Sequence, residues 1–182
     1  MRGGIVSKHN HAKTHHHSHA KETMSPEEVV SSLLHLAQTA LAAGDHESAA
    51  TSYASVLQLG DNAVALYNLG SLYAHGLGVR QDYMEAARLF RRAELLGNAR
   101  AGKLCQKCML DYMIADLADK SPADLYAMMA VFVSKVYPEA DHKKAEVKNG
   151  LIAVALTNRR RGDEAGASKL FQAAEYADIG EA

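Results

Sequence analysis

A recurring triplet of apolar residues constrains the fold of this 182-residue chain more than any other feature. Each triplet has a small residue, an aromatic residue four positions later, and a second small residue three positions after that. The triplets are Ala49-Tyr53-Val56, Ala86-Phe90-Ala93 and Ala167-Phe171-Ala174, and the first two lie 37 residues apart. Small residues let two helices approach closely, while the aromatic ring fills the groove to the next pair. A repeat of this length predicts an α/α solenoid.

Turn and capping residues divide the chain into helices. The segment Ser25-Pro26-Glu27-Glu28 has the order of a capping box, with Pro at the first helical position. Gly44 is expected to end this helix and Asp45 to cap the next. The expected apolar stripe of the first helix consists of Leu33, Leu36, Ala37 and Ala40. The eight expected helices span about 25–43, 45–60, 62–75, 82–97, 98–118, 121–137, 141–161 and 163–176. The sequence therefore predicts an all-α, superhelical α/α solenoid of about four helical hairpins.

The chain divides into a tail and a repeat domain. Residues 1–24 hold six of the ten histidines among Gly, Ser, Lys and Asn, and such a segment cannot bury enough apolar surface to fold. We expect a disordered tail there and a repeat domain over 25–182, with units at about 25–60, 61–97, 98–137 and 141–177. The third unit is degenerate, because Cys105-Gln106 stands where the second unit has Leu69-Gly70.

Composition excludes several classes of function. The formal net charge of −1 gives no field that attracts nucleic acid or an anionic membrane, and no run of 18 apolar residues predicts a membrane span. Two cysteines are too few for a disulfide scaffold, and no signal peptide is visible. No phosphate loop, nucleophile elbow, HExxH or dinucleotide motif occurs. We expect a cytoplasmic protein that is not an enzyme and needs no cofactor.

The segment Ala63–Asn98 resembles a Sel1-like repeat. It contains the pattern A-x-x-x-LG-x-x-Y-x-x-G-x-GV-x-x-D-x-x-x-A-x-x-LF, whose long hairpin loop distinguishes Sel1-like repeats from tetratricopeptide repeats. The units at 30–60 and 148–177 resemble the tetratricopeptide form more loosely. The resemblance implies a scaffold or adaptor that binds a peptide or partner protein on its concave face, as a monomer or weak homo-oligomer.

The resemblance also implies which residues face the partner. In this family the first helix of each pair lines the concave surface, and in its peptide-clamping members an Asn at the position of Asn68 contacts the ligand backbone. A cation at the position of Arg100 holds a carboxylate, which suits the planar guanidinium group. The candidate binding residues are Gln38, Tyr67, Asn68, Ser71, His75, Arg100, Lys103 and Arg159. The alternative is that Arg100 and Lys103 belong to an ordinary solvated helix face.

Three further motifs have a chemical and a structural interpretation. The imidazoles of the tail can bind Zn²⁺ or Ni²⁺, so the alternative function is that of a metal-binding or metal-responsive protein. The tail has no nearby Cys or carboxylate that would complete a tetrahedral site. The histidines concerned are His15, His16, His17 and His19. Cys105 and Cys108 lie on one helical face, where we expect them to line the core. The tripeptide Arg161-Gly162-Asp163 occupies the same repeat position as Gly44-Asp45, so a turn explains it.

Overall fold

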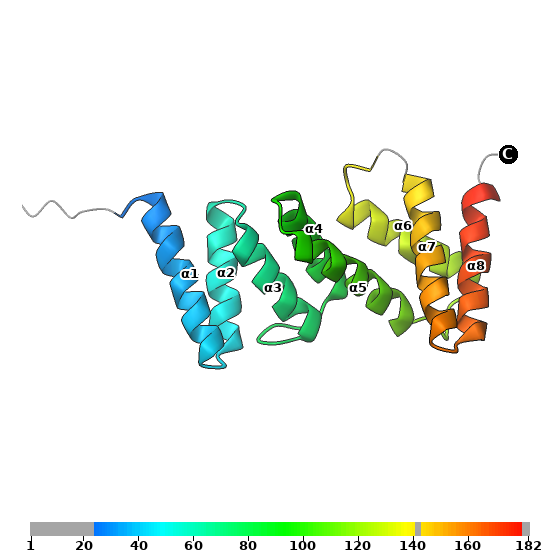
Figure 1. Ribbon diagram of the computed structural model, residues 1–182, viewed down its shortest axis with the longest axis horizontal. Coiled ribbons are helices and arrows are strands. Elements are labelled where there is room, and N and C mark those ends of the chain that lie inside the picture. Colours follow the sequence, from blue (N-terminus) through cyan, green and yellow to red (C-terminus); the bar gives the residue numbers. More distant parts are fainter. Residues whose placement is uncertain (1–23, 141–142, 180–182) are drawn as a thin grey trace, which may run out of the picture.

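The computed structural model describes residues 24–140 and 143–179, and these residues form eight α-helices without a strand. The helices are α1 (Pro26–Ala42), α2 (His46–Leu59), α3 (Ala63–His75), α4 (Tyr83–Leu95), α5 (Ala99–Ala115), α6 (Pro122–Val136), α7 (Lys143–Arg160) and α8 (Glu164–Ile179). They stand in one elongated row that begins with α1 at one end and finishes with α8 at the other (Figure 1). The predicted all-α solenoid of eight helices is confirmed.

Capping residues set the helix ends, as the sequence predicts. The Glu28 N–H donates to Ser25 Oγ over 3.2 Å, and the Ser25 N–H donates to Glu28 Oε2 over 2.7 Å, which completes a capping box. The same device, made by Ser121 and Asp124, begins α6. Two helix ends differ from the prediction by three residues, since α5 ends at Ala115 rather than near Ala118 and α8 continues to Ile179 rather than ending near Tyr176.

Close helix approach at α3 and α4 uses the small and aromatic residues of the repeat. A Cβ added to Gly70 would lie 3.1 Å from a ring carbon of Phe90, whose side chain is only 1% exposed. Tyr67 meets the same ring edge-on, with centroids 5.8 Å apart. The missing side chain at Gly70 therefore lets the Phe90 ring lie against the α3 backbone.

The long loop between α3 and α4 joins this hairpin to the preceding one. Gly78 in this loop has φ +66°, and an added Cβ there would overlap the backbone of His46 and Glu47 at the start of α2. Only glycine combines this conformation with so close a backbone approach. The loop thus fixes the second hairpin against the first.

The apolar stripe predicted for α1 is partly wrong. Ala37 is fully buried, but Leu36 is 54% exposed, whereas Leu69 at the equivalent position of α3 is only 6% exposed. Within the described residues no helix precedes α1, so the face that α2 covers on α3 has no neighbour on α1. Ser32 and Thr39 also stand on α1 where α3 has the buried Ala65 and Leu72. The first helix therefore presents a more polar outer face, as terminal repeats do.

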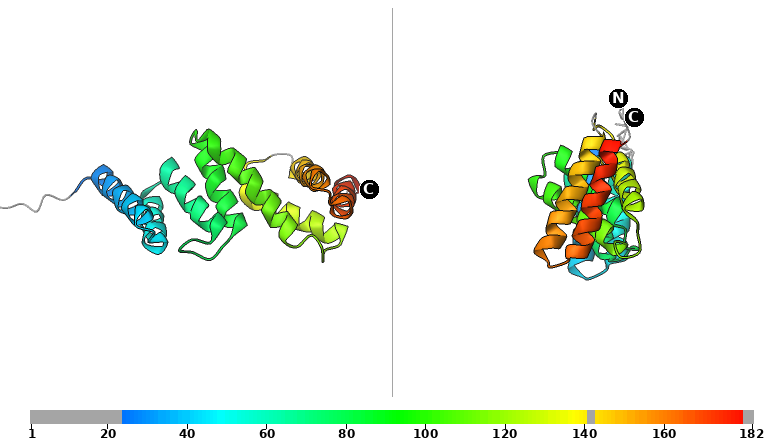
Figure 2. Two further views of the ribbon diagram at one scale, coloured as in Figure 1. Left: turned by 60° about the horizontal axis from the view of Figure 1, so that its bottom comes forward. Right: turned by 90° about the vertical axis from the view of Figure 1, so that its right-hand side faces the viewer.

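The third unit does not pack as a regular hairpin. The helices α5 and α6 make only sparse contact, although α1–α2, α3–α4 and α7–α8 pack extensively as pairs. Instead α5 packs along α4, while α6 contacts α4, α7 and α8. Figure 2 shows α5 and α6 following one another toward the C-terminal end, where α7 and α8 lie across them. This arrangement agrees with the absence of a small and aromatic triplet in α6.

The structural interpretations of two motifs are confirmed. Cys105 and Cys108 are free thiols that are 0% and 3% exposed. Gly162 has φ +86°, and Asp163 Oδ1 accepts a 2.8 Å hydrogen bond from the Gly166 N–H at the start of α8. The Arg-Gly-Asp sequence is therefore a helix–turn–helix junction.

Candidate functional site

Two adjoining hollows lie on either side of α5. The first, of about 470 Å³, is bounded by α3 and α5, and Phe90 of α4 contributes to its lining. The second, of about 490 Å³, is bounded by α5 and α7, with Val133 and Tyr137 from α6 and its C-terminal end. Lys107 lines both hollows. The two hollows and the face of α5 between them are here called the α3–α5–α7 groove, which is lined mainly by the first helix of each pair.

The groove collects four of the eight candidate binding residues. The first hollow is lined by Tyr67, Ser71 and His75. The second is lined by Lys103. Of the remaining four, Gln38 and Arg100 are exposed on α1 and α5 and line neither hollow. Asn68 donates its side-chain amide to the Val64 carbonyl over 3.0 Å, within its own helix.

Arg159 also lies outside the two hollows. Its guanidinium carbon is 4.9 Å from the centre of the Phe171 ring, and Nε donates to Glu164 Oε2 over 3.3 Å. Both partners belong to α8, so the side chain is engaged with the second helix of its own hairpin.

The first hollow is rich in hydrogen-bonding groups. Gln81 Nε2 donates to the Ala74 carbonyl over 2.9 Å and to the Tyr83 hydroxyl over 3.1 Å, which fixes the loop at the edge of the hollow. His75 Nδ1 lies 2.8 Å from the Ser71 carbonyl, and Nε2 makes no hydrogen bond with another described residue. The hollow can thus offer imidazole, hydroxyl and amide groups to a polar ligand.

The second hollow has an apolar floor and a polar rim. Apolar side chains from three helices form the floor: Met109, Leu110, Val133, Ala153 and Val154. Gln106 on α5 and Asn149 on α7 lie on opposite walls, and neither side-chain amide bonds to another described residue. Lys103 on the α5 wall also makes no ion pair there. An apolar centre with a polar rim is the usual construction of a non-obligate protein interface.

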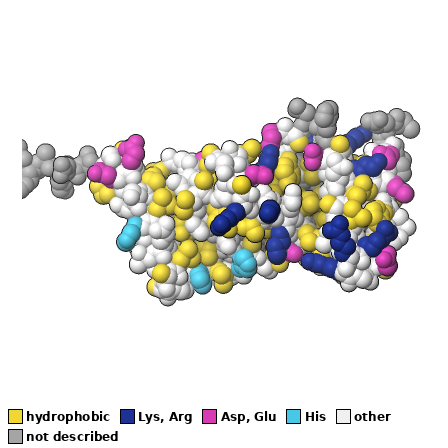
Figure 3. All heavy atoms as spheres, in the orientation of Figure 1, with side chains coloured by type: hydrophobic (Ala, Val, Ile, Leu, Met, Phe, Trp, Pro, Cys, Tyr) yellow, Lys and Arg dark blue, Asp and Glu magenta, His cyan; other side chains and the backbone are white. Residues whose placement is uncertain are grey.

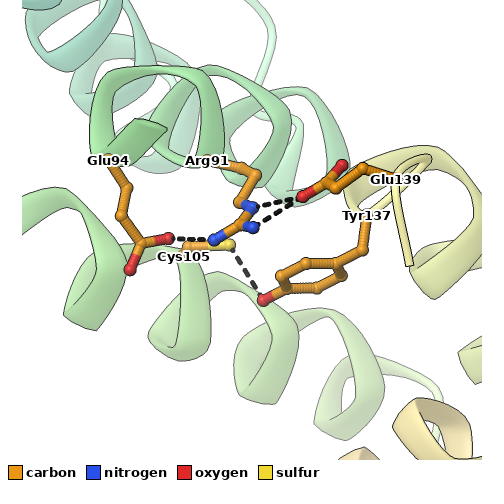
Figure 4. A network of polar contacts seen from close by, with 5 residues as sticks. All are labelled: Arg91, Glu94, Cys105, Tyr137 and Glu139. Atoms are coloured by element: carbon orange, nitrogen blue, oxygen red, sulfur yellow. Dashed lines mark hydrogen bonds and ion pairs between the residues drawn. The ribbon is translucent and has the colours of Figure 1, made fainter. Parts of the chain in front are cut away.

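A polar network holds the end of α6 beneath this hollow (Figure 4). Arg91 of α4 donates to Glu94 over 2.7 Å and to Glu139 over 2.6 Å, and its guanidinium lies 5.1 Å from the centre of the Tyr137 ring. The Tyr137 hydroxyl lies 3.4 Å from Cys105 Sγ. Burial raises the pKa of both the Tyr137 hydroxyl and the Cys105 thiol, so both groups are neutral near pH 7. The network therefore positions the floor of the hollow without providing an ionised nucleophile.

Within the part of the chain that the structure describes, Lys and Arg occur only from Arg80 onward. Residues 25–79 contain five acidic side chains and no Lys or Arg, and the first cation of the repeat domain is Arg80. Figure 3 shows Lys and Arg side chains gathered over the middle and the C-terminal half of the face that it views, while histidines lie over the N-terminal half. The groove thus runs from a cation-free region at α3 to a cationic one at α5.

Sequence reasoning missed several lining residues. Lys107 follows Lys103 by four positions and Arg100 by seven, so helical periodicity alone could have placed all three on one face of α5. No pattern in the sequence pointed to Gln106, Asn149 or Tyr83, because their place in the groove depends on how separate hairpins meet.

No group of three His, Cys, Asp or Glu side chains that could hold a metal ion occurs in the described ranges. The candidate histidines His15, His16, His17 and His19 lie outside those ranges. None of the helices described is long and apolar enough to cross a membrane.

Comparison with protein families identifies a Sel1 repeat at residues 63–98. These residues comprise α3, the long loop with Gly78, and α4, which are the elements that form one side of the groove. Comparisons with characterised proteins and with solved structures gave no match. The chain is therefore a helical-repeat protein that contains one Sel1 repeat, formed by α3, the long loop and α4.

Proposed function

We propose that this chain is a non-enzymatic scaffold that binds a segment of a partner protein along the α3–α5–α7 groove. Sel1 repeats generally mediate protein interactions, which supports the general class of function. The observation that carries the proposal is the pair of hollows that share Lys107, because two adjoining recesses can each receive a side chain from one partner segment.

The polar groups of the groove support binding rather than catalysis. His75 bonds only to a backbone carbonyl, and no histidine in the described parts of the chain bonds to a Ser, Cys or carboxylate side chain. The burial of Cys108 raises the pKa of its thiol to about 12, which leaves it protonated. An activated nucleophile needs a base within hydrogen-bond reach, and these residues do not supply one.

A displayed peptide library tests the proposal. Peptides selected on the full chain should lose affinity when either hollow is blocked, by Ser71→Arg in the first or Ala153→Trp in the second. Arg88→Ala is the matched control, because Arg88 is an exposed residue of α4 that lines neither hollow. Peptides that bind both blocked variants as tightly as they bind the unmodified chain, or a failure to select any peptide, would contradict the proposal.

The wider setting of the scaffold is part of the same proposal. We expect it to act in the cytoplasm, as a monomer or weak homo-oligomer, and to need no cofactor. The groove itself accounts for one partner segment and requires no second copy of the chain.

A further inference from the structure

Four large apolar side chains are exposed along one edge of the row of helices. They are 44–61% exposed and belong to the ends of α2 and α4 and to the first turn of α3: Leu59, Val64, Leu95 and Leu96. The α2–α3 and α4–α5 junctions lie next to one another at the upper edge of the row, and α1 begins at the same edge (Figure 1). Leu59 and Leu96 are 37 residues apart, at equivalent positions of the first and second units. The repeat itself therefore places exposed apolar residues on a common edge.

An ion pair joins the two junctions. Arg92 of α4 donates through Nε to Asp61 Oδ2 of the α2–α3 link over 3.4 Å. Leu95 and Leu96 follow Arg92 by three and four positions, so they lie about one helical turn beyond it. Val64 follows Asp61 by three positions. The apolar side chains therefore flank a pair whose charges cancel, and with that pair they are here called the apolar edge.

The apolar edge has the composition of a contact surface. Exposed apolar side chains are ordinary when they are scattered singly, whereas a group of them with polar residues around it is typical of an interface. No described residue covers the four side chains, which are all at least 44% exposed. None of them lines either hollow, so the edge is separate from the α3–α5–α7 groove.

The charges at the two ends of the edge indicate which partner fits it. Glu27 lies in the first turn of α1 at one end, and Arg100 lies in the first turn of α5 at the other. Both side chains are exposed, and neither makes an ion pair or a side-chain hydrogen bond with another described residue. A partner of uniform charge would be attracted by one end and repelled by the other.

A second copy of the chain meets this pattern at both ends. The two-fold axis of an isologous dimer brings each end of a surface against the opposite end of the same surface on the other copy. Glu27 of each copy would then lie against Arg100 of the other. At the centre the Asp61–Arg92 pairs carry no net charge, so the two copies do not repel one another there.

We infer that the apolar edge is the interface of a two-fold homodimer in which the two copies lie antiparallel. The leucine and valine side chains of both copies pack at its centre, and the Glu27–Arg100 contacts close its ends. Both grooves stay open, because no residue of the interface lines a hollow. The inference goes beyond the proposed function; where both hold, one dimer binds two segments of a partner and gains affinity from their linkage.

Sedimentation velocity of the full chain without peptide tests the inference. We expect the weight-average sedimentation coefficient to rise between about 1 and 100 µM, because a small interface gives a weak dimer. Leu96→Glu should weaken the association by about tenfold or more, because it puts a charge at the centre of the interface. Leu156→Glu is the matched control and should leave the association unchanged, because Leu156 is 41% exposed on α7, away from the apolar edge.

Exchange of charge between copies provides the stricter test. Glu27→Arg and Arg100→Glu should each weaken the association by about tenfold, because each variant brings like charges together at both ends of the interface. An equimolar mixture of the two variants should associate as strongly as the unmodified chain, because each copy then supplies the charge that the other lacks. Recovery on mixing cannot come from a change in the fold of either variant, and circular dichroism shows that the helices of each persist.

Three outcomes overturn the inference. The chain could stay monomeric over the whole concentration range, Leu156→Glu could weaken association as much as Leu96→Glu, or the mixed variants could fail to recover. Because no peptide is present, these results are independent of the displayed library. A dimer that selects no peptide contradicts the proposed function alone, and a monomer that binds library peptides in its groove contradicts this inference alone.

Discussion

Gly78 shows how much one residue contributes to the joint between hairpins. It has φ +66°, and a Cβ at this position would overlap the backbone of His46 and Glu47. We expect Gly78→Ala to lower the free energy of unfolding by about 3 kcal/mol, because the alanine meets both left-handed strain and a backbone that must move. Urea denaturation followed by circular dichroism measures the change.

Gly44→Ala is the control for that substitution. Gly44 has a similar φ of +77°, but nothing lies within 4 Å of an added Cβ, so only the conformational strain applies. Its expected loss is about 1 kcal/mol. Equal losses for the two variants would mean that the close approach at Gly78 does not hold the hairpins together.

The two cysteines should be inert while the chain is folded. Cys105 and Cys108 are almost completely buried, and burial raises the pKa of both thiols, for Cys108 from 9.0 to about 12. Raising the pH through about 9 should therefore accelerate thiol labelling of the urea-unfolded chain but not of the folded chain, because only the unfolded thiols ionise in that range. Labelling with a chromogenic disulfide follows both rates, and rapid labelling of the folded chain would contradict the burial.

Among the helices, α1 differs from α3 in having no preceding neighbour in the described structure. Leu36 is 54% exposed, whereas its equivalent Leu69 is 6% exposed. We expect Leu69→Ala to cost about 3 kcal/mol of stability and Leu36→Ala less than about 1 kcal/mol. Thermal unfolding of both variants measures the difference. A large loss at Leu36 would show that another part of the molecule covers the outer face of α1.

A network around one arginine holds the residues that follow α6. Arg91 joins Glu94, Glu139 and the Tyr137 ring, and its side chain is only 23% exposed. We expect Arg91→Ala to cost about 1–2 kcal/mol and to speed amide hydrogen exchange in α6 and residues 137–140. The control is Arg92→Ala, which removes an ion pair to Asp61 that is exposed on both sides. Unchanged exchange in α6 after loss of Arg91 would contradict the role assigned to the network.

The sequence predicted elements better than their packing. Helix ends followed from local signals such as the Ser25–Glu28 capping box and the Gly162-Asp163 turn, because caps involve residues only a few positions apart. The packing of an aromatic ring among small residues also followed from the repeat spacing, as the Phe90 ring against Gly70 shows. The exposure of Leu36 could not be predicted, since an apolar stripe does not reveal that the helix has no neighbour on that face.

The candidate site was predicted only in part for the same reason. The groove is lined by Tyr67, Ser71, His75 and Lys103, because they lie on the inner faces of the first helices α3 and α5. Gln106 and Asn149 could not be found from the sequence, since their positions on opposite walls depend on the displaced α6 and on the placement of α7.

At the scale of the whole molecule, the row of helices separates two kinds of surface. Residues 25–79 carry no Lys or Arg, and the cations gather from Arg80 onward (Figure 3). The groove connects both regions through Lys107.

The central claim is that the α3–α5–α7 groove is the binding surface, and hydrogen exchange of the full chain with and without a library-selected peptide tests it most directly. Amides of α3, α5 and α7 near the lining residues should become more protected, while those of α2 and α8 should not change. Protection confined to α2 and α8, or spread evenly over all eight helices, would contradict the account.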